Sequence, residues 1–272
     1  MAQTTTAPGA GGVEFDRIGA GEPLLLIHGT GLARFVWDPL IEHLAPRRDL
    51  LIIDLPGHGR SPAPPPGVPH TPPGYASVIA RWLDGLGLDR VHIAGNSVGG
   101  WTALELGKLG RARSIVALAP AGLWERESPW RASGQLWATH HLGRLFAPLT
   151  PIAMRSRAGR AVLLSGSFAK PGNVPPEVAI ELDHTFRSCP TFDTHLRATR
   201  RERFRDGDEI DAPVTVVWGD KERILPAKAR RHDELPASTR YIELGGVGHL
   251  MTWDDPKLVA RTILEGSAVE RL

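Results

Sequence analysis

Short apolar runs alternate along most of the chain with segments in which apolar residues recur every three to four positions. A continuous apolar run that ends in glycine is typical of a buried parallel strand, and a three-to-four spacing is typical of an amphipathic helix. The runs predict strands over residues 13–19, 23–29, 50–57, 90–100, 114–120, 213–220 and 239–246. The spaced segments predict helices over 35–45, 75–88, 101–110, 226–235 and 256–265.

This alternation of strand and helix predicts the class of the fold. A strand followed by a helix and a parallel strand builds an open sheet whose two faces are covered by helices. We therefore expect an α/β protein with a mostly parallel central sheet of seven to eight strands flanked by helices.

Two segments interrupt the alternation. The proline-dense stretch SPAPPPGVPHTPPG (61–74) cannot form a helix or a central strand, so it predicts a stiff surface loop. Residues 121–205 contain helical stretches, tryptophans and arginines but no strong strand. We interpret them as a helical cap inserted between two parts of one core domain, 1–120 and 206–272, with the arginines on a solvated outer face.

Composition narrows the range of functions. The chain has 272 residues, of which 42% are hydrophobic and 23% charged, as in ordinary globular proteins. A net charge of +2 is too close to neutral to indicate nucleic acid or an anionic membrane as the main partner. The single cysteine, Cys189, excludes an internal disulfide framework. We expect a leader of about a dozen residues without signal-peptide features, no membrane span and a cytoplasmic location.

Four glycine-flanked motifs close predicted strands, and together they suggest a site. They are HGTG (28–31), GNSVGG (95–100), GDKE (219–222) and GGVGH (245–249). In an open parallel sheet the carboxyl ends of strands form the active site. A serine hydroxyl is a weak nucleophile that needs an imidazole and an orienting carboxylate, and the chain supplies Ser97, an acid near 220 and His249 in that order.

These motifs carry a resemblance to a known family. The chain resembles the α/β-hydrolase superfamily, specifically the members with a helical cap after the strand that follows the nucleophile helix. From about residue 13 onward the matching elements recur in order: HGTG, DLPGHGRSP (54–62), GNSVGG, VVWGDKERILP (216–226) and GGVGHLMTWDDP (245–256).

The resemblance implies a role for individual residues. Ser97 would be the nucleophile on a strained strand-to-helix turn, and His249 the general base. The backbone amides of Val98 and Thr30 would form the oxyanion hole. His28 would orient the oxyanion loop, whereas Asp54 and His58 would belong to a structural turn.

The acid departs from the family pattern. Family members usually carry aspartate three residues after the glycine of the tryptophan-glycine pair, and in this chain that position is Glu222. Asp220 lies two residues earlier and is the alternative. Either carboxylate could orient His249, and we favour Glu222.

No motif of the sequence identifies the substrate or a cofactor, and the predictions for substrate contacts and metal depend on single residues. We predict substrate contacts by Gly29, Trp124, Trp137 and Leu250, with an apolar, uncharged substrate. No dinucleotide-binding motif precedes a strand–helix unit, so we predict no cofactor. The adjacent residues His140 and His141 should point apart on a helix without a third ligand, so we predict no metal.

The leading hypothesis is a serine hydrolase that cleaves a carboxylic ester, lactone or thioester of a small molecule through an acyl-enzyme. The resemblance also implies that Ser97 argues against the haloalkane dehalogenases and epoxide hydrolases of the superfamily, which use aspartate at this position. One alternative is hydrolysis of a carbon–carbon bond in ring-cleavage products, which the GNSVGG motif and Trp253 favour and Leu250 disfavours. A second is a non-catalytic ligand-binding protein. The sequence predicts no particular oligomeric state.

Overall fold

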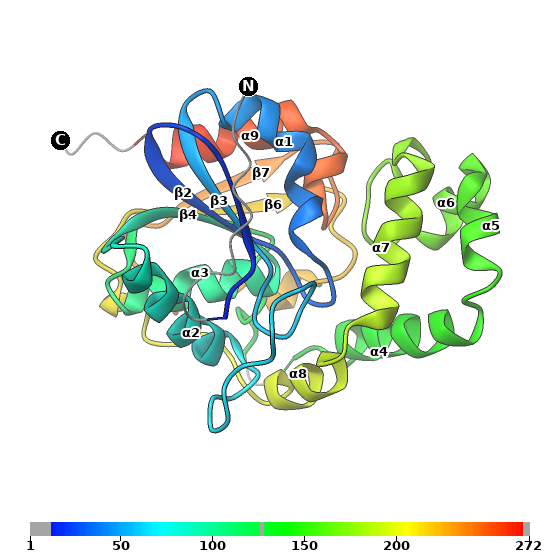
Figure 1. Cartoon of the computed structure of the whole chain (residues 1–272), viewed down its shortest axis with the longest axis horizontal. Helices are drawn as coiled ribbons and strands as arrows, with labels where there is room; N and C mark the ends of the chain where they lie inside the picture. The colour runs from blue at the N-terminus through cyan, green and yellow to red at the C-terminus, as the bar shows by residue number, and fades with distance from the viewer. Residues whose placement is uncertain (1–11, 126–127, 269–272) are drawn as a thin grey trace.

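A seven-stranded sheet forms the centre of the computed structural model, which describes residues 12–125 and 128–268; the leader predicted at the N-terminus lies almost wholly outside them (Figure 1). The strand order is β1-β3-β2-β4-β5-β6-β7. Only β1 is antiparallel to its neighbour, β3, and the other pairings are parallel. The strands are β1 (Phe15–Gly19), β2 (Glu22–Ile27), β3 (Arg48–Ile53), β4 (Val91–Asn96), β5 (Ala112–Leu118), β6 (Val214–Gly219) and β7 (Arg240–Leu244). The predicted α/β architecture is confirmed.

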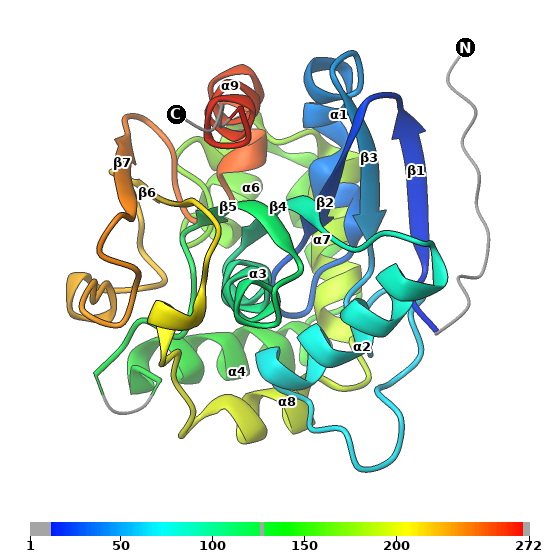
Figure 2. The same ribbon diagram turned by 90° about the vertical axis from the view of Figure 1, so that its left-hand side faces the viewer.

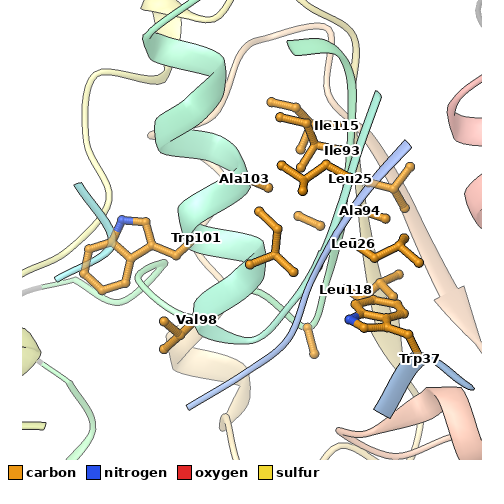
Figure 3. Close-up of a cluster of buried hydrophobic side chains, with 14 of the residues drawn as sticks. Leu25, Leu26, Trp37, Ile93, Ala94, Val98, Trp101, Ala103, Ile115 and Leu118 are labelled. Atoms are coloured by element: carbon orange, nitrogen blue, oxygen red, sulfur yellow. The ribbon is translucent and has the colours of Figure 1, made fainter. Parts of the chain in front are cut away.

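Helices cover both faces of the sheet (Figure 2). One face carries α1 (Asp38–Leu44) and α9 (Pro256–Gly266), and the other carries α2 (Pro72–Gly85) and α3 (Val98–Lys108). The central strands are buried between these layers, which is why they read as continuous apolar runs. Figure 3 shows leucines and isoleucines of the central strands packed between α3 and Trp37, which follows β2 in sequence.

Two helices differ from what the sequence predicted. Helix α2 begins at Pro72, inside the stretch expected to be a loop, because proline is tolerated in the first turn of a helix. The helix expected over 226–235 is wrong: only the 3-10 turn η4 (Ala227–Ala229) forms there. Half of the ten residues in this segment are charged, and its few apolar residues do not recur at the spacing of a helix face that packing could stabilise.

Five further helices lie together beside the sheet (Figure 1). They are α4 (Trp130–Leu145), α5 (Thr150–Arg155), α6 (Arg157–Leu163), α7 (Pro176–Ser188) and α8 (Phe192–Thr199). The remaining 3-10 turns are η1 (Arg34–Trp37), η2 (Pro171–Asn173), η3 (Gly207–Glu209) and η5 (Met251–Trp253). We call residues 128–205 the helical segment. Its function as a cap stays a prediction, as do the boundaries of the two domains.

The chain enters and leaves the helical segment along paired backbone stretches, which we call the stem. The amide of Phe204 donates to the carbonyl of Gly122 at 2.9 Å, and the amide of Ser128 donates to the carbonyl of Arg200 at 3.0 Å. The two connections therefore run side by side. Among the residues that the structure describes, no helix has the length and hydrophobicity needed to cross a bilayer.

Candidate active site

Ser97 lies on a sharp turn between β4 and α3. Its backbone has φ 57° and ψ −118°, in the region that non-glycine residues rarely adopt. Its amide donates to the carbonyl of Leu118 at 2.9 Å. The turn depends on glycine because a Cβ on Gly99 would lie 2.2 Å from the carbonyl oxygen of Ile27. The local sequence thus holds a serine in a strained conformation that the surrounding backbone fixes.

His249 and Glu222 form a buried pair at the ends of β7 and β6. Nδ1 of His249 lies 2.7 Å from Oε2 of Glu222, and the Glu222 side chain is fully buried. The second carboxylate oxygen, Oε1, accepts the backbone amides of Ile224 at 2.7 Å and Leu225 at 3.0 Å. The carboxylate is therefore held by three donors, one of them the imidazole.

The environment keeps Glu222 ionised. Burial alone would raise the pKa of its carboxyl group. The charge and the hydrogen bond of His249, together with the two backbone amides, outweigh burial and bring the pKa below its ordinary value. A carboxylate in this state can hold the imidazole with Nδ1 protonated, which leaves Nε2 free to accept a proton.

Asp220 has other partners. Its carboxylate accepts the amide of Gly246 at 2.7 Å and pairs with Lys221 at 3.0 Å. These interactions lower the pKa of its carboxyl group, with the hydrogen bond from Lys221 as the largest contribution. The structure thus brings Glu222, and not Asp220, into hydrogen-bond contact with His249.

Asn96 links the histidine loop to the serine turn, a contact that sequence reasoning missed. Its side-chain amide donates to the backbone carbonyl of His249 at 2.9 Å and to that of Leu118 at 3.1 Å. The residue precedes Ser97 in the GNSVGG motif, so its position next to the serine was the available signal. One side chain thus fixes the His249 backbone against the strand that carries Ser97.

The loop after β2 lies against the serine. A Cβ placed on Gly29 would be 3.2 Å from Cβ of Ser97. His28 holds this loop: its Nδ1 donates to the carbonyl of Gly29 at 2.8 Å, and its Nε2 accepts the amide of Leu55 at 2.9 Å. Burial lowers the pKa of His28, so it stays in this neutral form. The loop therefore presents Thr30 beside the serine turn.

A second missed residue, His195 on α8, contacts the same loop from the helical segment. Its Nε2 lies 3.2 Å from Oγ1 of Thr30. Its Nδ1 lies 3.0 Å from the carbonyl of His70 and 3.1 Å from the hydroxyl of Tyr75. Complete burial, followed by repulsion from a neighbouring histidine, lowers the pKa of His195 to about 3. No motif in the sequence marked this neutral histidine.

An apolar cavity of about 650 Å³ lies between the helical segment and the sheet. From the sheet side it is lined by Leu32, Ile224 and Leu250. In sequence these follow the loop after β2, Glu222 and His249. The remaining wall comes from α4, α5, α6 and α7 and the turns beside them, and most of its residues are apolar. Leu250 thus lines this cavity, and Gly29 lies beside Ser97; contact of either residue with a substrate stays a prediction.

The two tryptophans predicted to contact substrate lie elsewhere. Trp124 is buried in the stem, edge-on to Trp101 with ring centroids 5.5 Å apart, and its indole donates to the carbonyl of Glu202. Trp137 is 52% exposed on α4 and its ring contacts His141. Neither lines the cavity, because the first is used in packing and the second faces outward on its helix.

Asp54 and His58 have structural partners. The Asp54 carboxylate accepts the amides of Arg34 at 2.8 Å and Arg60 at 3.0 Å and pairs with the Arg34 guanidinium. His58 is buried and its Nδ1 donates to the carbonyl of Pro56 at 3.2 Å. These contacts support the structural role expected for the turn.

One group of side chains among the described residues has the composition of a metal site. His140, His141 and Asp193 place ligand atoms within 4.8 Å of one another, although adjacent histidines were expected to point apart without a third ligand. Nε2 of His141 already binds Asp193 at 3.0 Å, and Nδ1 of His140 donates to the carbonyl of Phe186 at 2.8 Å. An ion would have to replace the first of these bonds.

Comparison with known proteins identifies the family of the chain. A model of the alpha/beta hydrolase family matches residues 24–262, and the chain belongs to that family. The chain is 32% identical over 200 residues to a protein named epoxide hydrolase EphH from Mycobacterium tuberculosis, which covers 69% of this chain and 91% of the relative. The predicted family is thereby confirmed.

Two solved structures have a similar fold. Carboxylesterase CesB from Bacillus subtilis is 17% identical with a TM-score of 0.72, and the match covers 98% of this chain and 91% of that one. A meta-cleavage product hydrolase from Pseudomonas fluorescens is 18% identical with a TM-score of 0.73, and the match covers 96% of both chains. At these identities the likeness extends to the fold.

Proposed function

We propose that the protein is a serine hydrolase that cleaves a carboxylic ester of a small apolar molecule through an acyl-enzyme. The observation that carries the proposal is the buried Glu222–His249 pair, fixed by Asn96 to the turn that presents Ser97. The apolar cavity whose wall includes Leu250, next to His249, supplies the space for the substrate.

In this mechanism Ser97 Oγ attacks the acyl carbon while His249 Nε2 accepts its proton. Glu222 stabilises the imidazolium that forms, and the amides of Thr30 and Val98 donate to the developing oxyanion. The imidazolium then gives its proton to the departing alcohol. Water, deprotonated by His249, attacks the acyl-enzyme and releases the acid and the free serine.

Elementary chemistry favours an ester over an epoxide, although a relative is named an epoxide hydrolase. If the Ser97 oxygen opened an epoxide, the product would be an ether that water and a histidine cannot cleave. Attack on an acyl carbon gives an ester, which the same histidine can hydrolyse. A serine at this position is therefore suited to turnover on acyl substrates.

The cavity wall indicates the substrate class. Its one carboxylate, Asp183, is paired with Arg187 at 2.8 Å and accepts the hydroxyl of Thr150 at 2.7 Å. The remaining wall is uncharged, so binding would come from apolar contact. We infer an uncharged, mainly hydrocarbon acyl or alcohol portion, enclosed by the helical segment acting as a cap.

The test is a panel of p-nitrophenyl esters of increasing acyl length, with a fluorophosphonate probe for the nucleophile. We expect turnover and labelling of the wild-type protein, and neither in Ser97→Ala. A panel extended to a lactone, a ring-cleavage product and styrene oxide separates the alternatives. Turnover of the ring-cleavage product alone would favour carbon–carbon hydrolysis, and the absence of both labelling and turnover would favour a ligand-binding protein.

A further inference from the structure

Exposed apolar side chains are concentrated on one part of the helical segment. Of the ten large hydrophobic side chains that are exposed among the described residues, eight lie between positions 137 and 163. Leu145 is 71% exposed and Val162 is 72% exposed. A monomer that exposes so many large apolar residues together has a surface adapted to contact something other than water. We call this set the apolar patch: Trp137, Leu142, Leu145, Phe146, Leu149, Ile152, Val162 and Leu163.

The apolar patch surrounds the opening of the cavity. Five of its members are also cavity-lining residues, namely Leu142, Phe146, Leu149, Val162 and Leu163. Four members follow the spacing of one helix face across the end of α4 and the next turn, at positions 142, 145, 146 and 149. Figure 1 shows α5 and α6, which carry Ile152, Val162 and Leu163, on the far side of α7 from the sheet.

The charge of the same region is strongly positive. Residues 132–176 contain five basic side chains and no aspartate or glutamate, whereas the whole chain carries only +2. Within the part of the chain that the structure describes, none of the five forms a salt bridge. Arg160 is buried and donates to the carbonyls of Met154 and Arg155, and the others are exposed. The five are Arg144, Arg155, Arg157, Arg160 and Lys170.

We propose that the apolar patch docks on a lipid bilayer surface that carries anionic headgroups. Leucine, phenylalanine and tryptophan side chains would enter the boundary between headgroups and acyl chains, while the exposed arginines would meet the phosphates. The net charge of the whole chain did not indicate an anionic membrane, because it sums the five basic residues of this region with the net negative charge of the remaining residues. A second copy of the protein fits the patch less well, since pairing like patches would bring two clusters of unpaired cations together.

Docking of the apolar patch on a bilayer would also place the opening of the cavity against the membrane. This opening would face the acyl-chain boundary, so an apolar ester could pass from the bilayer into the cavity without crossing water. This consequence rests on the proposed function, whereas the docking itself does not. Ser97→Ala should therefore bind vesicles as well as the wild-type protein.

The experiment is co-sedimentation of the full chain with large unilamellar vesicles. One set contains phosphatidylcholine with about 30 mol% phosphatidylglycerol and the other contains phosphatidylcholine alone. We expect binding to the anionic vesicles at about 0.02 M salt, with a marked loss at about 0.5 M, because salt screens the attraction. Each arginine near an anionic surface contributes about a fivefold gain in partitioning, or about 1 kcal/mol.

Two matched pairs of variants locate the binding surface. Leu145 is exposed at the end of α4 and does not line the cavity, and Leu145→Ser should weaken vesicle binding about tenfold. Leu109 is equally apolar and is also exposed, after the end of α3, and Leu109→Ser should leave vesicle binding unchanged. Arg155→Glu should weaken it at least fivefold, whereas Arg81→Glu on α2 should have little effect. Hydrolysis of a short water-soluble ester should be unchanged in Leu145→Ser.

Three results would overturn the proposal. The first is no binding to vesicles of either composition. The second is equal loss of binding in each variant and its control, which would place the contact elsewhere. The third is a dimer in sedimentation velocity without lipid that Leu145→Ser dissociates, which would identify a second copy as the occupant of the patch.

Discussion

Replacing Glu222 with glutamine gives the sharpest test of the site because the side chain keeps its size and loses only its charge. In the wild-type protein one carboxylate oxygen faces His249 and the other accepts two backbone amides. A glutamine has one acceptor end and one donor end, so it cannot accept hydrogen bonds on both sides. Its amide nitrogen must face either the imidazole or the two backbone N–H groups.

The number of buried groups left without a hydrogen bond decides which orientation of the glutamine amide is more stable. Turning the nitrogen toward the backbone would leave the amides of Ile224 and Leu225 buried without an acceptor, at about 1–3 kcal/mol each. Turning it toward His249 leaves both backbone amides with their acceptor and keeps the bond to Nδ1, with its direction reversed. Glutamine should therefore donate to Nδ1, which places the imidazole proton on Nε2, where it blocks base catalysis. In serine proteases the corresponding error in tautomer costs about 10⁴-fold in kcat, or about 5.4 kcal/mol of barrier.

The assay is kcat/KM for p-nitrophenyl acetate, with thermal unfolding measured in parallel to show that the variant folds. Asp220→Asn is the matched control, since it makes the same chemical change two residues away on a carboxylate bound to Gly246 and Lys221. We expect a loss of about 10⁴-fold in the first variant and less than about threefold in the second. Activity of Glu222→Gln within tenfold of wild type, or a greater loss in Asp220→Asn, would refute the reasoning.

Three further predictions test the surrounding structure. Thr30→Val keeps the backbone amide proposed for the oxyanion hole but loses the side-chain contact with His195, so kcat should fall about fivefold at constant KM. Thr30→Ser should restore kcat. Adding His195→Phe to Thr30→Val should cause no further loss. Because the native state keeps His195 neutral with a pKa of about 3, the unfolding free energy should decrease from about pH 6.5 downward. The slope should approach about 1.4 kcal/mol per pH unit in urea titrations and flatten in His195→Asn. Gly99→Ala should destabilise the fold by about 3 kcal/mol or more, seen as a lower melting temperature, since its Cβ would overlap the carbonyl of Ile27.

Each of these has a contrary result. Additive losses of activity in Thr30→Val and His195→Phe would show that the two side chains act separately. An unchanged acid slope in His195→Asn would assign the pH dependence to other groups. A melting temperature of Gly99→Ala equal to that of the wild type would mean that the serine turn can relax.

The strands and the motifs at their ends were predictable because buried parallel strands leave an unmistakable pattern. An apolar run such as LLLI in β2 has side chains on both faces of the strand that avoid water, so it is stable where helices cover both faces of the sheet. The return to the strand–helix alternation after the helical segment was predictable too, and the structure pairs β6 with β5 there. Local sequence and global fold agree at these positions.

The contacts made across long sequence separations were not predictable. Asn96 and His195 bind backbone or side chains more than 150 residues away, and nothing near them in sequence marks the partner. Tryptophan in a helical segment suggested a pocket wall, but Trp124 packs in the stem and Trp137 faces outward. Which face of a helix meets a cavity is decided by tertiary packing, which a weakly periodic sequence leaves open.

The stem has a consequence for how such a protein can diversify. Because residues on its two sides are hydrogen-bonded, as Gly122 is to Phe204, the ends of the helical segment lie next to each other in space. A foreign helical segment with equally close ends could be joined at the same two points without moving any strand. If the helical segment acts as the proposed cap, exchange of this one segment would change the range of substrates. The strand ends that hold Ser97, Glu222 and His249 would stay the same.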